Sequence, residues 1–326
     1  MTTLITGGIG WVPSHITLAI AATGEDVVTF DLMEPDDLFR DLLGGLYDRV
    51  TIVNGDITDI DQLKAVCALY GVKSIIHAAA ITPRTERETH EPARIIDVNL
   101  GGTVHALEVA RQLPNFRRFI YISSGAAVGG ASGAAKIDEA TPSHATNLYG
   151  ITKHTSERIV SRYRTLFGMD AVSVRFANVY GPMERVTPGY SGATELREML
   201  RIHFAGEVVK VNSRGGPWLD WTYVGDIAEG VKRIWEAPAL NHDLYTITCS
   251  LLSSIGDVLD AFTRHLSGFR YELVDRLDAN YVVSGDDPGP VPSNVRLKDE
   301  LGWAPPTSLD DGMRQYLDWI QRHGPQ

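Results

Sequence analysis

Short apolar runs alternate with longer segments of helical periodicity through the first half of the chain. This alternation is typical of β-α-β units and a parallel sheet. Several runs are apolar throughout, as expected for strands that are covered on both faces. The predicted strands are Thr3–Thr6, Asp26–Asp31, Val50–Asn54, Ser74–His77, Arg118–Ser123 and Ala171–Ala177. The predicted helices between them are Ser14–Thr23, Asp61–Tyr70, Ile95–Gln112 and Leu148–Phe167.

After about residue 178 the pattern loosens, and prolines and glycines gather in segments that are predicted to be loops. Two helices, Thr194–Phe204 and Val224–Glu236, are predicted there. We therefore expect an α/β fold with a doubly wound parallel sheet over residues 1–177. Residues 178–326 are expected to form mainly a smaller, discontinuous C-terminal lobe, with some segments returning to the first domain.

Composition narrows the class of protein. The 326 residues carry a formal net charge of -11, which argues against nucleic acid and against an anionic membrane surface. Cys67 and Cys249 lie far apart, and the histidines show no metal-binding spacing, so neither a disulfide framework nor a metal site is expected. The sequence shows neither a signal-peptide pattern nor an apolar run of membrane-spanning length. These features predict a cytoplasmic enzyme.

A glycine-rich loop, Thr6-Gly7-Gly8-Ile9-Gly10, follows the first predicted strand and precedes a helix. Glycines keep such a turn tight, and the backbone N–H groups of Gly7, Ile9 and Gly10 can approach a pyrophosphate at the helix N-terminus. Pro13 replaces the third glycine of the usual spacing, which puts the close packing of helix and strand in doubt more than phosphate binding.

Two carboxylates follow later strands. Asp31 ends the second predicted strand, 24 residues after Gly7, where it can accept both hydroxyls of a ribose and would repel a 2′-phosphate. This favours NAD over NADP. Asp56 and Ile57 follow the third strand and are predicted to lie near the adenine ring.

Tyr149-Gly150-Ile151-Thr152-Lys153 places a phenol and an ammonium one helical turn apart. A neighbouring lysine stabilises phenolate, which predicts a lowered pKa for Tyr149 and a role as general acid or base. Lys153 can also bind the nicotinamide ribose. The pair occurs by chance on many helices, but after a glycine cradle it indicates catalysis.

These motifs, taken in order, resemble the extended short-chain dehydrogenases/reductases, the NAD-dependent epimerase/dehydratase group. The resemblance covers nearly the whole chain, and it implies a Rossmann-type sheet that binds NAD and a smaller substrate lobe. It also implies a homodimer formed through the helices Ile95–Gln112 and Leu148–Phe167. The stretches that carry it are Thr6–Gly10, Asp31, Gly55–Ile57, His77–Ala80, Asn99–Thr103, Ser123-Ser124, Tyr149–Lys153, Arg175–Pro182 and Leu301–Pro305.

The resemblance assigns further residues. Ala78, Ala79 and Asn99 are expected beside the cofactor, and Thr82, Arg84 and Asn178 are expected to face the substrate. The family's catalytic serine or threonine falls on Gly125 in an ungapped match. Ser124 is the best substitute, with Ser123 or a group outside the motif as the alternative.

Two departures from the family pattern bear on the reaction. Gly125-Ala126-Ala127 lacks the acidic pair of the 4,6-dehydratases, which argues against dehydration by that route. Leu219 stands where nucleotide-sugar members often carry a diphosphate-binding arginine, and Arg214 is the nearest candidate to compensate. The missing arginine favours a substrate without a nucleotide.

The favoured function is therefore an NAD-dependent dehydrogenase acting at a secondary alcohol of a sugar, sugar acid or similar polyol. An epimerase that retains its NAD is the near alternative, with a nucleotide sugar as one possible substrate. A non-catalytic NAD-binding sensor or scaffold is the alternative from another class, and the altered serine motif is its main support.

Overall fold

A parallel sheet organises the computed structural model, which describes residues 1–82, 85–130, 135–176, 178–187, 189–190, 194–285 and 288–324. Within these ranges the sheet has seven strands in the order β3-β2-β1-β4-β5-β7-β11, and every pairing is parallel. The order reverses between β1 and β4, which is the Rossmann arrangement. The strands are β1 (Thr2–Thr6), β2 (Asp26–Asp31), β3 (Val50–Asn54), β4 (Val72–His77), β5 (Arg118–Ile122), β7 (Ala171–Phe176) and β11 (Leu244–Ile247). The predicted fold class is confirmed.

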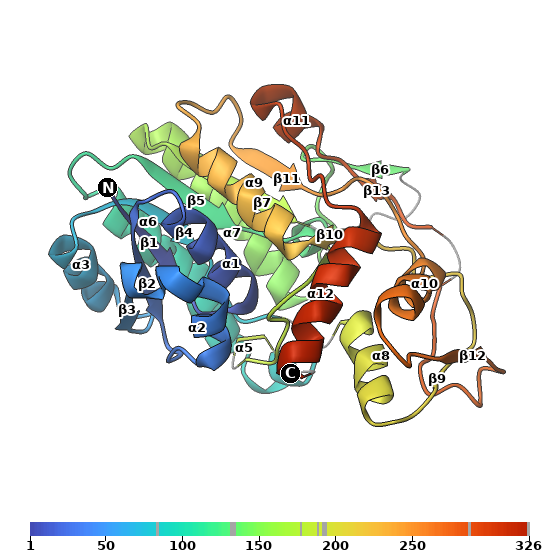
Figure 1. Cartoon of the computed structure of the whole chain (residues 1–326). Helices are drawn as coiled ribbons and strands as arrows, with labels where there is room; N and C mark the ends of the chain where they lie inside the picture. Colours follow the sequence, from blue (N-terminus) through green and yellow to red (C-terminus); the bar gives the residue numbers. More distant parts are fainter. Residues whose placement is uncertain are drawn as a thin grey trace.

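Helices cover both faces of this sheet (Figure 1). Those on one face, α1 (Trp11–Ala21) and α9 (Val224–Glu236), pack against each other over one apolar core. The other face is covered by α3 (Ile60–Leu69), α6 (Gly102–Ala110) and α7 (Leu148–Phe167), which bury side chains in a second core. Because both faces are covered, strands such as β5 are buried along their whole length.

The later half of the chain returns to the sheet at two places. β11 adds an edge strand beside β7, and α9 packs on α1. The helix Val224–Glu236, predicted within the stretch that was expected to form mainly the substrate lobe, therefore packs on the first domain, and its bounds as a helix are confirmed. Its many buried apolar side chains need a partner surface, and α1 provides that surface.

The smaller lobe stands beyond the carboxyl ends of the strands (Figure 1). It groups α8 (Glu195–Phe204), α10 (Ile255–His265), β9 (Val209–Val211) and β12 (Tyr271–Leu273), and the C-terminal helix α12 (Leu309–His323) packs against α10. The other α-helices and strands are α2 (Asp37–Leu43), α4 (Thr85–His90), α5 (Pro92–Ile96), β6 (Lys136–Ile137), β8 (Asn178–Tyr180), β10 (Trp221–Tyr223), β13 (Val291–Pro292) and α11 (Val295–Leu301).

Local sequence explains where the catalytic helix begins and ends. The side chain of Asn147 accepts a hydrogen bond from the Gly150 N–H at 2.8 Å and caps the N-terminus of α7. Gly168 ends the helix in the left-handed region at φ 64°. The predicted bounds Leu148–Phe167 are confirmed.

The predicted helix Ile95–Gln112 is wrong as a single regular helix. It is divided into α5, a π-helical segment over Asp97–Gly101, and α6. A π-helical turn widens the backbone and re-aims the side chains that follow. Here it buries the side chain of Asn99, which hydrogen-bonds the backbone of Ile81.

None of the helices within the described ranges has the length and apolar character that a membrane span requires.

Candidate active site

One cavity of about 940 Å³ runs along the carboxyl ends of the strands, between the sheet and the smaller lobe. Its wall on the sheet side comes from the loops that follow β1 to β5 and from α7. Its opposite wall comes from β8, the loop leading into α8, the Trp218–Trp221 segment and residues 289–292. Ligands of open α/β sheets bind at this edge, where the strand order reverses.

The glycine loop after β1 forms a tight cradle on the cavity wall. Gly7 has φ 67°, and a Cβ placed on it would lie 2.8 Å from the Cα of Ala79. Only glycine fits both the dihedral angle and this approach. Ala78 and Ala79 line the cavity beside Gly7, as predicted. A side chain larger than alanine would crowd the same space.

Gly10 precedes the first residue of α1 and lines the cavity. The first N–H groups of a helix have no intrahelical partner, so those of Trp11 and Val12 are oriented to bind an anion. Pro13 stands third in α1, where its missing N–H costs little, and it also lines the cavity. The cradle therefore fits the pyrophosphate of a dinucleotide.

Asp31 lies at the end of β2 on the cavity wall. Its two carboxylate oxygens accept hydrogen bonds of 3.0 Å each from the backbone N–H groups of Ile9 and Met33. Burial raises the pKa of Asp31, and these N–H groups oppose the shift. The carboxylate fits the predicted ribose contact.

Ile9 does not fit its predicted role. Its side chain is fully buried, it does not line the cavity, and its N–H is bonded to Asp31 instead of facing a phosphate. Ile9 therefore holds the carboxylate of Asp31 in position.

Asp56 and Ile57 follow β3 and line the cavity, as expected for the adenine end. Arg94 on α5 donates a hydrogen bond of 3.0 Å to Asp56. Burial raises the pKa of Asp56, but hydrogen bonds from Thr58 and Arg94 outweigh it and lower the pKa overall. Asp56 is therefore held as a carboxylate beside an apolar wall.

Asn99 lies behind the cavity rather than on its wall. It is 1% exposed and absent from the lining, and its amide bonds the N–H of Ile81 at 2.7 Å and the carbonyl of Ile81 at 2.9 Å. Since both ends of the amide are occupied, the structure does not support the predicted contact with the cofactor. Asn99 fixes the loop after β4, which forms part of the cavity wall.

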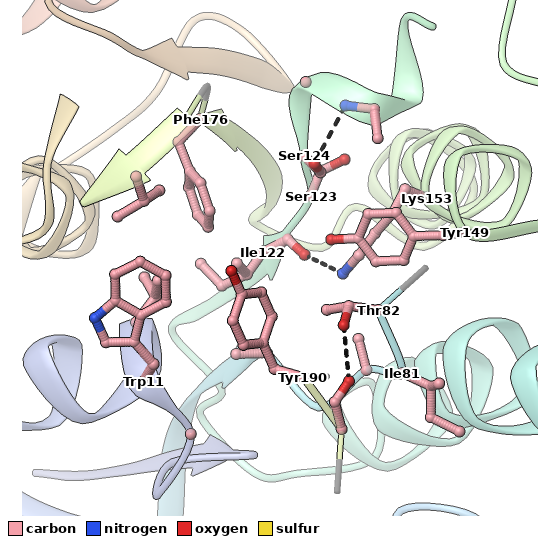
Figure 2. A pocket seen from close by; sticks show the side chains of 18 of the residues that line it. Trp11, Ile81, Thr82, Ile122, Ser123, Ser124, Tyr149, Lys153, Phe176 and Tyr190 are labelled. Carbon is pink, nitrogen blue, oxygen red and sulfur yellow. Dashed lines mark hydrogen bonds between the residues drawn. The ribbon is translucent and has the colours of Figure 1, made fainter. Parts of the chain in front are cut away.

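Tyr149 and Lys153 face the centre of the cavity from the first turns of α7 (Figure 2). The ammonium of Lys153 lies 5.6 Å from the centroid of the Tyr149 ring. It donates a hydrogen bond of 2.7 Å to the carbonyl of Ile122, the last residue of β5. Burial lowers the pKa of Lys153 to about 7, and the carboxylate of Glu157 opposes that shift.

The pKa of Tyr149 is raised by burial, while a side-chain hydrogen bond with Ser124 lowers it. The prediction that Lys153 lowers the pKa of Tyr149 is therefore wrong for the protein without bound NAD. The physical reason is that the ammonium is bonded to the Ile122 carbonyl and does not reach the phenol oxygen.

The two candidate serines point in different directions. Ser124 lines the cavity, interacts with Tyr149, and accepts a hydrogen bond of 3.2 Å from the Ala126 N–H. Ser123 is 1% exposed and donates to the buried carboxylate of Glu157. Both residues line the cavity, but of the two it is Ser124 whose hydroxyl interacts with the phenol of Tyr149.

The predicted substrate residues that the structure describes line the cavity from both walls. Thr82 lies on the sheet side, in the loop after β4, and Asn178 lies on the opposite wall in β8. The hydroxyl of Thr82 donates to the Gly189 carbonyl at 2.9 Å and so joins the two walls. Arg84 lies outside the described residues. The aromatic rings of Trp11 and Tyr190, whose centroids are 5.7 Å apart, also meet across the cavity (Figure 2).

Sequence reasoning did not identify Glu157, which organises the floor of the site. Its buried carboxylate forms an ion pair with the guanidinium of Arg175, with a shortest N–O distance of 2.6 Å. It also accepts a hydrogen bond from the hydroxyl of Ser123. Glu157 follows Lys153 by four residues, just as Lys153 follows Tyr149. This spacing places all three residues on one face of the helix and could have identified Glu157 from the sequence.

Sequence reasoning also did not identify Glu88. Its carboxylate accepts a hydrogen bond from the N–H of Leu148, the first residue of α7. A carboxylate at this end of a helix interacts favourably with the helix dipole. Glu88 therefore joins α4 to the turn that carries Tyr149.

The fold and this site define a Rossmann-type, NAD-binding enzyme with a tyrosine and lysine pair. A model of the NAD dependent epimerase/dehydratase family matches residues 3–247, and the chain belongs to that family. The predicted family, enzyme class and cofactor are confirmed.

Individual relatives span nearly the whole chain. A putative UDP-glucose 4-epimerase of Methanocaldococcus jannaschii is 28% identical, with 98% of each chain covered. A UDP-glucose 4-epimerase of Mycolicibacterium smegmatis is 27% identical, with 98% of this chain and 99% of the relative covered. Among solved structures, the UDP-glucose 4-epimerase of Thermus thermophilus in complex with NAD shares the fold at a TM-score of 0.80 and 23% identity, over 99% of this chain and 100% of that one.

Proposed function

We propose that this chain is an NAD-dependent dehydrogenase that oxidises a secondary alcohol of a free sugar, a sugar acid or a similar polyol. The observation that carries the proposal is that Tyr149, Ser124 and the glycine cradle at Gly7 line one cavity. When bound, NAD supplies the hydride acceptor. The protein supplies the proton acceptor and the orientation of the alcohol.

Each catalytic side chain has a separate task. The hydroxyl of Ser124 orients the reacting hydroxyl, and Tyr149 removes its proton as general base. Lys153 holds the end of β5 through its bond to the Ile122 carbonyl and does not by itself lower the pKa of Tyr149. The cationic nicotinamide ring of bound NAD would supply positive charge that favours the phenolate, the form that accepts the proton.

The proposal of a substrate without a nucleotide rests on the far wall of the cavity. Leu219 lies there between Trp218 and Asp220, and Trp221 follows. On a wall that offers no helix N-terminus, a diphosphate is bound chiefly by arginine and lysine side chains. In the described part of the lining the cationic side chains are Lys153 on α7 and Arg87 and Arg94 on α4 and α5, and none belongs to the Trp218–Trp221 wall.

Arg214 does not replace the missing arginine. Its guanidinium donates to Asp260 at 2.7 Å and to the Tyr271 hydroxyl at 2.6 Å, and the residue does not line the cavity. These contacts hold β12 and α10 together. The suggestion that Arg214 compensates for Leu219 is therefore not supported.

A screen for NADH formation tests this proposal. Free aldoses, aldonates and polyols are offered with NAD, beside the matching UDP-sugars. We expect NADH with at least one free sugar or sugar acid, and no turnover of UDP-sugars. Turnover of a UDP-sugar with no free substrate accepted would reject the substrate class.

An NAD-retaining epimerase is the second candidate, and the names of the curated relatives favour it. It would use the same tyrosine and lysine to oxidise and then reduce one carbon. Purified protein that holds NAD through gel filtration, and that interconverts epimers without net NADH, would establish this reaction and exclude the dehydrogenase.

We also propose that the enzyme is a cytoplasmic homodimer that pairs through α6 and α7. Leu166 and Phe167 at the end of α7 are 55% and 46% exposed, and Ile151 on the same helix is 42% exposed. Apolar side chains exposed in this way are stabilised by a partner surface. We expect light scattering to give the molecular mass of two chains for the wild-type protein and of one chain for Leu166→Glu.

A further inference from the structure

The segment that follows β8, Pro182–Arg185, is bonded to the start of α1, and we call it the bridging segment. The carbonyl of Pro182 accepts a hydrogen bond of 2.8 Å from the indole N–H of Trp11, which lies 171 residues earlier in the chain. Nε2 of His15 lies 3.0 Å from the same carbonyl. Burial lowers the pKa of His15 to about 4, so the ring is neutral and donates to this carbonyl.

The bridging segment is also fixed to the smaller lobe. Met183 is fully buried at φ 64°, a conformation that costs residues other than glycine about 1–2 kcal/mol, and its sulfur accepts from the Ser14 hydroxyl at 3.7 Å. The buried carboxylate of Glu184 accepts from the Thr194 N–H at 3.1 Å and from the Tyr316 hydroxyl at 2.7 Å. Thr194 is the N-cap of α8 and Tyr316 lies in α12, so the segment connects α1 to both helices.

Arg185, the last residue of the bridging segment, extends to the glycine cradle. Its side chain is 6% exposed. Nη2 donates a hydrogen bond of 3.0 Å to the carbonyl of Ile9, and Nη1 donates to the carboxylate of Asp36, the N-cap of α2. One guanidinium therefore joins the loop after β1 to the loop after β2, the two loops assigned to the pyrophosphate and the ribose of NAD.

The bond to Ile9 controls the shape of the cradle. The Ile9 carbonyl and the Gly10 N–H belong to one planar trans peptide unit and point in opposite directions. Arg185 holds this carbonyl, and the Gly10 N–H donates to the Gly7 carbonyl at 3.0 Å and closes the turn. The N–H of Ile9 donates to Asp31 at 3.0 Å. Ile9 is therefore bonded to Arg185 at one end and to the ribose-binding carboxylate at the other.

The charge of Arg185 acts on Asp31 as well. Burial raises the pKa of Asp31, and the charge of Arg185 lowers it. Three backbone N–H groups also lower it, and they belong to Ile9, Leu32 and Met33. Arg185 does not line the cavity, so it acts on a ligand there through these neighbours. Apolar side chains of similar volume often stabilise a fold as well as a buried ion pair does, so packing alone does not explain a charge at this position.

We propose that Arg185 is a positioning residue for NAD. From the side of the smaller lobe it holds the glycine cradle and the Asp31 carboxylate in the geometry that binds the adenosine diphosphate part of the cofactor. This role does not rest on the proposed substrate, because a dehydrogenase and an epimerase both need NAD in this cavity. The motifs recognised in the sequence do not include Arg185.

ADP-ribose is the probe, because it contains the adenosine, the pyrophosphate and the second ribose of NAD but no nicotinamide. Calorimetry on the full chain freed of NAD measures the Kd of ADP-ribose and of NAD. Arg185→Met removes the charge and both donor groups, and it should weaken both ligands about tenfold or more. Arg185→Lys keeps the charge and one donor group, so it should bind both ligands more tightly than Arg185→Met does.

Arg164→Met is the matched control. Arg164 also joins a carboxylate to a backbone carbonyl, at 3.8 Å from Asp170 and 2.6 Å from the oxygen of Leu240, and it does not line the cavity. Its loss should leave both Kd values unchanged. Wild-type Kd values in folded Arg185→Met, no gain from Arg185→Lys, or an equal loss in Arg164→Met would overturn the proposal.

Hydrogen exchange on the wild-type chain keeps the proposal testable if Arg185→Met does not fold. No residue of the bridging segment lines the cavity. Coupling between two sites is reciprocal, so a ligand that depends on this segment must in turn stabilise it. Saturating ADP-ribose should therefore slow the exchange of the amides of Met183, Glu184 and Arg185. Exchange that ADP-ribose leaves unaltered would overturn the proposal.

Discussion

The ammonium of Lys153 donates a 2.7 Å hydrogen bond to the backbone carbonyl of Ile122. This bond ties the catalytic helix to the end of β5, the strand that leads into Ser123 and Ser124. It also holds the charge behind the phenol of Tyr149 (Figure 2). One buried lysine therefore joins the helix that carries Tyr149 to the strand that leads into Ser124.

Tyr149→Phe should remove the proton acceptor and leave the cavity shape unchanged. We expect kcat to fall by about 10²–10⁴-fold, the usual contribution of a general base. The Kd for NAD, measured by calorimetry, should change little, because the glycine cradle and Asp31 remain. Full activity in the variant would exclude Tyr149 as the base, and wild-type protein with NAD bound but no activity on any substrate would favour a sensor.

The buried Lys153 makes stability depend on pH. Burial lowers its pKa to about 7 in the fold, whereas the unfolded value is near ~10.4. Between these values the unfolded chain binds more protons, so the free energy of unfolding rises with pH, by up to about 1.4 kcal/mol per unit. Lys153→Met should abolish this rise between about pH 7 and pH 10 in protein free of NAD.

Lys73→Met is the control for that experiment. Lys73 also donates to a backbone carbonyl, that of Pro114 at 2.8 Å, but it is partly exposed. Denaturant titrations at a series of pH values should show the wild-type slope in this variant. An equal loss of slope in both variants would contradict the assignment to Lys153.

Ser124→Ala and Ser123→Ala form a matched pair of adjacent variants. Loss of the Ser124 hydroxyl should lower kcat about tenfold or more. It should cost less stability than loss of Ser123, because the bond that Ser124 accepts from the Ala126 N–H joins neutral groups at 3.2 Å. Loss of the Ser123 hydroxyl should cost about 1.5–3 kcal/mol of stability, the range for a hydrogen bond to a charged group. Steady-state kinetics and urea unfolding separate the two effects, and a reversed pattern would exchange their roles.

Gly7→Ala should be more damaging than Gly10→Ala. At Gly7 the added Cβ meets backbone at 2.8 Å and φ is 67°, a conformation that costs other residues about 1–2 kcal/mol. At Gly10 the nearest atom is 3.2 Å away and φ is -61°. We expect the larger losses of stability and of NAD affinity for Gly7→Ala. Equal effects would show that the approach of Ala79 to the cradle is not limiting.

The order of apolar strands, the glycine loop and the tyrosine-lysine spacing are local patterns, and each was predicted from sequence. The bounds of β2, β3, α7 and α9 agree with the prediction, because the apolar pattern that defines each element lies within its own segment. The placement of α9 was not predictable in this way, because its apolar face would fit the core or the smaller lobe equally well. Contact with α1 decided it.

The same division applies to the site. The sequence by itself determined the candidates for the chemistry, because Tyr149, Lys153, Gly7 and Asp31 are recognised by local spacing and by position at strand ends. The tertiary structure alone decided what each side chain touches. Lys153 bonds Ile122, Asn99 bonds Ile81, and Ser123 bonds Glu157 while Ser124 faces the cavity. Each of these contacts joins residues that are distant along the chain, so no local pattern predicts it.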